Sequence, residues 1–68
     1  MVRVRIIGNG EEIREYTYTT EGRAEAALRR KGYRLIWRAG WLARLTRGLL
    51  SSWDGPNGEI ADVLGGAQ

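Results

Sequence analysis

The chain has 68 residues but no cysteine and no histidine, and this absence constrains its fold more than any other feature. Small domains often rely on disulfides or a structural zinc ion because their hydrophobic cores are small. Both devices need side chains that this chain lacks. We therefore expect one domain that is held by its apolar core or by a partner. A hydrophobic content of 43% favours folding over disorder.

The N-terminal part of the chain predicts a β-hairpin. Residues 2–7 alternate apolar and charged side chains, which is the period of a half-buried strand. The turn signal Gly8-Asn9-Gly10 follows, and residues 11–18 form the second strand.

The preferred register of this hairpin has a three-residue loop with a bulge. It would place Arg3 opposite Glu15 and Val2 opposite Tyr16. Apolar and aromatic side chains then gather on one face: Val2, Val4, Ile6, Tyr16 and Tyr18.

Residues 21–31 predict an α-helix. Ala24, Ala27 and Leu28 recur at the spacing of a buried helical stripe, and Thr19 or Thr20 can cap the helix N-terminus. Glu25 and Arg29 stand four residues apart, in the order that favours an ion pair. Gly32 is a natural stop because it tolerates the left-handed conformation.

The second half of the chain is harder to assign. Residues 33–38 predict a third strand, and residues 41–50 predict a helix with an apolar face. The alternative for residues 41–50 is a strand that pairs back on residues 33–38. Residues 51–58 have the composition of a loop, and residues 59–64 suit either a short strand or a helical turn.

The predicted helical face of residues 41–50 consists of Trp41, Leu42, Leu45 and Leu49. The expected fold is α+β: a β-β-α-β core with a mostly antiparallel sheet, followed by a second short helix or strand. The domain spans residues 1–64, and residues 65–68 are expected to form a frayed tail.

Several catalytic and metal-binding chemistries find no support in the sequence. Carboxylate pairs such as Glu21 and Glu25 are interpreted as solvated surface groups, because a chain this short rarely builds a pocket for acid–base work. The segment 54–59 lacks the ligand spacing of a calcium loop and is interpreted as a plain turn. Gly8-Asn9-Gly10 precedes a strand rather than a helix, which excludes the dinucleotide-binding pattern. We predict no enzyme activity, no metal and no cofactor.

Charge is strongly segregated along the chain. Residues 26–53 contain seven basic side chains and no acidic one, whereas both flanking segments carry a net negative charge. All three tryptophans lie in residues 37–53. Interleaved rings and guanidinium groups are typical of single-stranded nucleic-acid platforms, but tryptophan and arginine are also enriched in protein-interface hot spots. The predicted binding residues are Arg29, Arg30, Arg34, Arg38, Arg44, Arg47, Tyr33, Trp37 and Trp41.

A structural interpretation of the tryptophans competes with the functional one. A 68-residue chain without phenylalanine needs large side chains in its core, so at least two of Trp37, Trp41 and Trp53 are expected to be buried. The positively charged side chains of residues 29–31 also suit the negative end of a helix dipole.

The leading hypothesis is a non-catalytic module whose basic surface docks on nucleic acid or on a nucleic-acid-handling complex. The alternative is a protein inhibitor or adaptor, of the size typical of phage and mobile-element proteins, that occupies an acidic surface of a host protein. A homodimer stays open. A membrane-surface role of residues 34–50 is disfavoured because a folded domain would occupy their apolar face. The absence of cysteine and of a secretion signal favours a cytoplasmic location.

Overall fold

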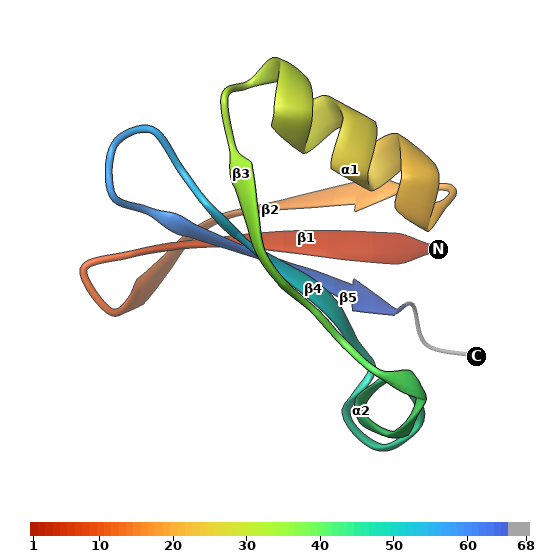
Figure 1. Cartoon of the computed structure of the whole chain (residues 1–68). Helices are drawn as coiled ribbons and strands as arrows, with labels where there is room; N and C mark the ends of the chain where they lie inside the picture. Colours follow the sequence, from red (N-terminus) through yellow and green to blue (C-terminus); the bar gives the residue numbers. More distant parts are fainter. Residues whose placement is uncertain (66–68) are drawn as a thin grey trace.

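The computed structural model describes residues 1–65, with the side chains of Ala43, Thr46 and Arg47 outside the description. The elements follow in the order β1 (Val2–Gly8), β2 (Glu11–Tyr18), α1 (Glu21–Arg30), β3 (Arg34–Arg38), α2 (Trp41–Arg47), β4 (Leu49–Asp54) and β5 (Ile60–Gly65). The strands form one five-stranded antiparallel sheet in the order β2-β1-β5-β4-β3, and α1 crosses one face of it (Figure 1). The fold is therefore α+β, as the sequence predicts.

The β1–β2 hairpin turns on two residues rather than on the three that we expected. Gly8 pairs with Glu11, and the turn residues Asn9 and Gly10 have φ angles of 54° and 79°. Two consecutive positive φ angles are typical of the type I′ turn, whose twist matches that of the flanking strands.

A bulge at Ile13 then shifts the hairpin register, because Ile6 faces Arg14 and Ile7 faces Glu12. Val2 consequently lies opposite Tyr18, two residues beyond the predicted partner. Between the bulge and the open end of the hairpin, this shift of two residues leaves each side chain on its predicted face, so the expected apolar face forms in spite of the wrong register.

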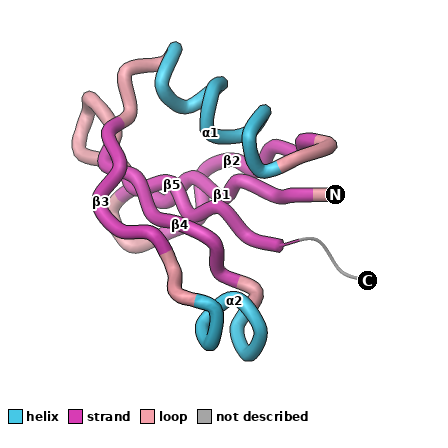
Figure 2. Tube along the Cα trace, turned by 45° about the vertical axis from the view of Figure 1, so that its right-hand side comes forward, coloured by secondary structure: helices cyan, strands magenta, loops and turns pink. Residues whose placement is uncertain are grey.

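Helix α1 begins and ends as its sequence predicts. The Thr20 hydroxyl accepts a hydrogen bond from the Arg23 amide over 3.2 Å. At the other end, the Tyr33 amide donates to the Leu28 carbonyl over 3.0 Å, and Gly32 adopts a φ of 90°. Between these ends, α1 carries the chain from one edge strand, β2, to the opposite edge strand, β3 (Figure 2).

The second half of the chain departs from the predicted helix and loop. Residues 41–50 divide at Gly48, whose φ of 70° ends α2, and β4 starts at Leu49. Residues 51–54 belong to β4 rather than to a loop. Residues 60–65 form strand β5, which lies between β1 and β4. Of the expected tail, Gly65 is the last residue of β5, and residues 66–68 lie outside the described part of the chain.

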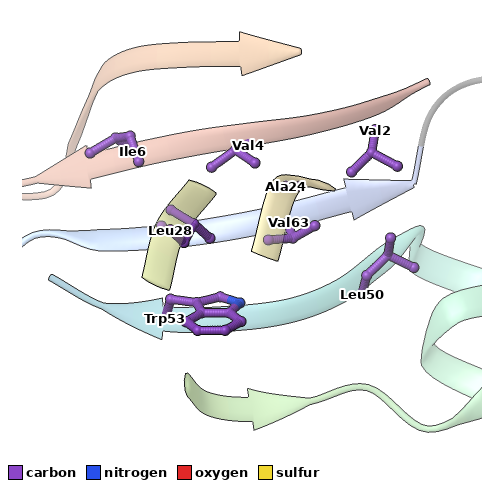
Figure 3. Close-up of a cluster of buried hydrophobic side chains, with 9 residues drawn as sticks. Val2, Val4, Ile6, Ala24, Leu28, Leu50, Trp53 and Val63 are labelled. Carbon is purple, nitrogen blue, oxygen red and sulfur yellow. The ribbon is translucent and has the colours of Figure 1, made fainter. Parts of the chain in front are cut away.

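The core lies between α1 and the covered face of the sheet (Figure 3). Trp53 is 1% exposed and is the largest fully buried side chain. Its cross-strand neighbour is Ala61, and the small side chain of Ala24 lets α1 approach the sheet. Nine buried residues form this cluster: Val2, Val4, Ile6, Ala24, Leu28, Leu50, Trp53, Ala61 and Val63.

Candidate functional site

The predicted binding residues lie on three consecutive elements. Arg29 and Arg30 form the last turn of α1, and Tyr33 follows this helix. Strand β3 contributes Arg34, Trp37 and Arg38, and α2 contributes Trp41 and Arg44. Arg47 is the last residue of α2, and its side chain lies outside the description.

Arg44 is held by an ion pair to helix α1. Its Nη1 and Nη2 atoms donate to Oε1 and Oε2 of Glu21, each over 3.0 Å. Its Nε donates to the Ala39 carbonyl over 3.1 Å. This two-pronged contact lowers the pKa of Glu21 and raises that of Arg44. The guanidinium of Arg44 is therefore largely committed to joining α2 to α1.

Arg38 also pairs with a glutamate of α1, one helical turn beyond Glu21. Its Nη2 donates to Glu25 Oε1 over 2.9 Å. Glu25 is only 6% exposed and also accepts from the Ser51 hydroxyl over 3.4 Å, while Ser51 accepts from Trp53 Nε1 over 2.9 Å. This short network satisfies a carboxylate that would otherwise be buried without a partner.

Arg29 lies against the core rather than beside Glu25. Its guanidinium carbon is 5.3 Å from the centre of the Trp53 ring, a cation–π geometry. The intrahelical pair predicted between Glu25 and Arg29 is therefore absent, and the expectation that Glu21 and Glu25 are solvated surface groups is wrong. Sequence spacing could not reveal their partners, because both arginines arrive from elements that follow α1.

The basic segment thus does not form one continuous cationic surface. Three of its arginines contact groups of this same chain: Arg29, Arg38 and Arg44. Arg30 and Arg34 are exposed and form no ion pair within the described residues. The uncompensated charge is smaller than the sequence suggests.

The tryptophans separate into one core residue and two surface residues. Trp53 is the one tryptophan in the core, whereas Trp37 is 45% exposed and Trp41 is 74% exposed. The expectation that at least two tryptophans are buried is therefore wrong. Ten residues of α1 cover only one face of the sheet, and valines, alanines and one large indole fill the space beneath it.

Exposed apolar side chains gather on the same part of the molecule. Of the eight large apolar side chains that are exposed in the described part, six lie in residues 35–45. We call this the β3–α2 surface, and its members are Leu35, Ile36, Trp37, Trp41, Leu42 and Leu45. The face of α2 that we expected to be buried is thus exposed, because α2 lies beyond the ends of β3 and β4 rather than on the sheet (Figure 1).

The two edges of the sheet differ in how they are protected. At one edge, β2 presents charged side chains at Glu11, Glu12, Arg14 and Glu15, which discourage pairing with another strand. At the other edge, β3 has an unpaired side, and all five of its residues are exposed. Three of these five are apolar, while Arg34, Arg38 and a bulge at Ile36 are features that limit strand addition at this edge.

The face of the sheet opposite α1 carries charges of both signs. Strand alternation places Arg5, Asp62 and Ser52 there, and they are consecutive partners across β1, β5 and β4. Ser52 donates to Asp62 over 2.8 Å, and Arg5 lies 3.2 Å from Glu12. The one aromatic side chain in this row is Trp37, opposite Ser52.

The described residues contain neither a cluster of metal ligands nor a helix that could span a membrane. No group of three or more acidic residues is placed to hold a metal ion within residues 1–65. Among the helices of that part, none is long and apolar enough to cross a bilayer.

Comparisons with known proteins give no relative for this chain. No protein-family model, no curated protein and no solved structure matches it. What the protein does must therefore be argued from its own surfaces.

Proposed function

We propose that the chain is a non-catalytic protein-binding module whose β3–α2 surface docks on an acidic, partly apolar segment of another protein. The observation that carries this proposal is the concentration of exposed apolar side chains beside an unpaired strand edge. Apolar patches on the surface of folded proteins mark interaction sites. Tryptophan and arginine are also the residues that most often anchor interfaces.

The chemistry of β3 favours an acidic partner over a second copy of the chain. Its sequence places Arg34 and Arg38 at the two ends of a short apolar run. Strand β3 carries no carboxylate, so pairing of two β3 strands would bring Arg34 and Arg38 of both copies to one interface without an opposite charge at the positions that face them. A strand that carries carboxylates at these positions would be attracted instead.

Nucleic acid is the second candidate, because Arg34 and the exposed ring of Trp37 lie on the same face of β3. Two observations weigh against it. Carboxylates such as Asp54 and Asp62 share that face, and they would repel phosphate. Leu42 and Leu45 are exposed in α2, and aliphatic side chains do not stack on bases as rings do.

The proposal is tested with a display library of random peptides selected against the immobilised protein. We expect enriched peptides to combine apolar residues with aspartate or glutamate. The double variant Trp41→Ser/Leu45→Ser should weaken their binding at least about tenfold, since buried interface anchors each contribute ~1–2 kcal/mol or more. The control variant Ile13→Ser removes an exposed apolar side chain from the opposite edge and should bind as the parent does.

The same samples distinguish the second candidate. At moderate salt, we expect no electrophoretic shift with generic single-stranded DNA or RNA. A shift that weakens steeply with salt and disappears in Arg34→Glu would favour nucleic acid instead. Enriched peptides that bind Trp41→Ser/Leu45→Ser and the parent equally would contradict the proposed protein-binding surface.

A further inference from the structure

A hollow lies at the end of the sheet away from α2. It has a volume of about 560 Å³, is open to solvent and is bordered by the β1–β2 turn, the end of α1 and the β4–β5 loop. Helix α2 connects β3 to β4 at one end of these strands, and their other ends lie toward this hollow (Figure 1). We call it the hairpin cleft, and it is separate from the β3–α2 surface.

The lining of the hairpin cleft combines apolar and aromatic side chains with polar groups. Ile6 and Leu28 are core residues that reach its floor. The half-buried rings of Tyr16 and Tyr33 pack against that core and form its walls. Hollows of 300–1,000 Å³ with apolar walls and a few polar groups are typical of small-ligand sites, as a rough guide.

Two cations contact Tyr16. Arg14 Nη1 donates to the Tyr16 hydroxyl over 3.2 Å, and Lys31 Nζ lies 4.1 Å from the centre of its ring. The hydrogen bond from Arg14 is the main cause of a lowered Tyr16 pKa. Neither cation forms an ion pair within residues 1–65. An anion between them would relieve their mutual repulsion.

The one carboxylate that lines the hairpin cleft already accepts hydrogen bonds from this chain. Glu59 accepts from the Tyr33 hydroxyl and from the Asn57 amide, each over 2.9 Å. Burial, together with this bond, raises the pKa of Tyr33 to about 12, while hydrogen bonds lower that of Glu59. Glu59 therefore orders the β4–β5 loop and stays ionised there, and with Arg14 and Lys31 it leaves the hairpin cleft a net positive charge.

We propose that the hairpin cleft binds a small organic anion. Its flat apolar body would rest between Tyr16 and Tyr33, and its phosphate or carboxylate group would lie between Arg14 and Lys31. Both groups offer oxygen atoms that accept from guanidinium and ammonium donors. This inference does not depend on the proposed protein-binding function, because the two sites share no residue.

The experiment is a titration of isotope-labelled protein with 1-naphthyl phosphate, followed by amide chemical shifts in NMR spectra. We expect saturable shifts at Asn9, Lys31, Asn57 and Gly58, which border the hairpin cleft. Inorganic phosphate and 1-naphthol, which each lack half of the ligand, should bind at least about tenfold more weakly. Titration with 1-naphthoic acid reports whether a carboxylate replaces the phosphate.

A pair of matched double variants tests the two cations. Arg14→Gln/Lys31→Gln should weaken binding of 1-naphthyl phosphate about tenfold, since each exposed charge contact contributes a few-fold. Arg23→Gln/Arg30→Gln removes the same net charge from a separate hollow beside Tyr18 and should keep parental affinity. Parental affinity in the first variant, no saturable shift, or shifts confined to residues 35–45 would overturn the proposal.

Discussion

Glu25 compensates the charge of one arginine of the basic segment. It is buried in α1, and it pairs with Arg38 and contacts Ser51. Its position in the sequence resembles that of an ordinary surface glutamate, four residues before Arg29. The spacing rule for helices considers only neighbours on the same helix, whereas the partner of Glu25 comes from β3.

The Glu25 carboxylate should therefore matter for stability. Glu25→Gln leaves the Arg38 guanidinium without its anionic partner, and we expect a loss of about 1–2 kcal/mol in the free energy of unfolding. The estimate is modest because Arg38 keeps 46% of its side chain exposed to water. Urea unfolding measures the effect, and Glu11→Gln at the exposed β2 edge is the control. Equal stability of the two variants would show that the network is not formed.

The structural roles of residues were predictable where a local rule applies. The cap at Thr20, the stop at Gly32 and the inward face of β1 follow from short-range preferences. The burial of Trp53 and the exposure of Trp41 could not be predicted in this way. Both depend on where α1 and α2 lie relative to the sheet.

Among the elements, α2 lies outside the sheet and is joined to α1 by the ion pair between Arg44 and Glu21. The pKa of Glu21 is lowered in the folded protein, chiefly by the hydrogen bond from Arg44. The ion pair therefore contributes stability above the ordinary glutamate pKa of 4.5. That contribution is lost as the pH falls through the lower, folded-state value.

We accordingly expect the parent protein to lose stability below about pH 4.5 more steeply than Glu21→Gln does. Urea midpoints measured at neutral pH and at about pH 3 test this. Some acid dependence should remain in the variant, because the pKa of Glu59 is also lowered. A variant whose midpoint changes with pH as much as that of the parent would contradict the ion pair. Glu11→Gln is again the matched control.

The strands β4 and β5 show why the second half of the chain was difficult to predict. A bulge at Leu50 interrupts the two-residue period of β4. In β5, Ala61 and Val63 face the core, while Ile60 and Leu64 on the other face are half-buried. Apolar residues on both faces remove the alternation that identifies a strand.

At the scale of the whole molecule, the positive charge of residues 26–53 is divided between two roles. Arg38 and Arg44 join β3 and α2 to α1, and Arg29 lies over the Trp53 ring. Arg34 stays at the exposed edge. The net charge predicted a cationic surface, but the fold exposes an apolar one that arginines border. This arrangement could not be read from the sequence, because it depends on pairing between α1 and later segments.

The exposure of the tryptophans tests this account most directly. Acrylamide quenching of three variants that each keep one tryptophan, with phenylalanine at the other two positions, reports each ring separately. We expect strong quenching and red-shifted emission for Trp41, intermediate quenching for Trp37, and weak quenching with blue-shifted emission for Trp53, in line with exposures of 74%, 45% and 1%. The values should not change with protein concentration. A Trp41 ring as protected as Trp53 would contradict an exposed β3–α2 surface.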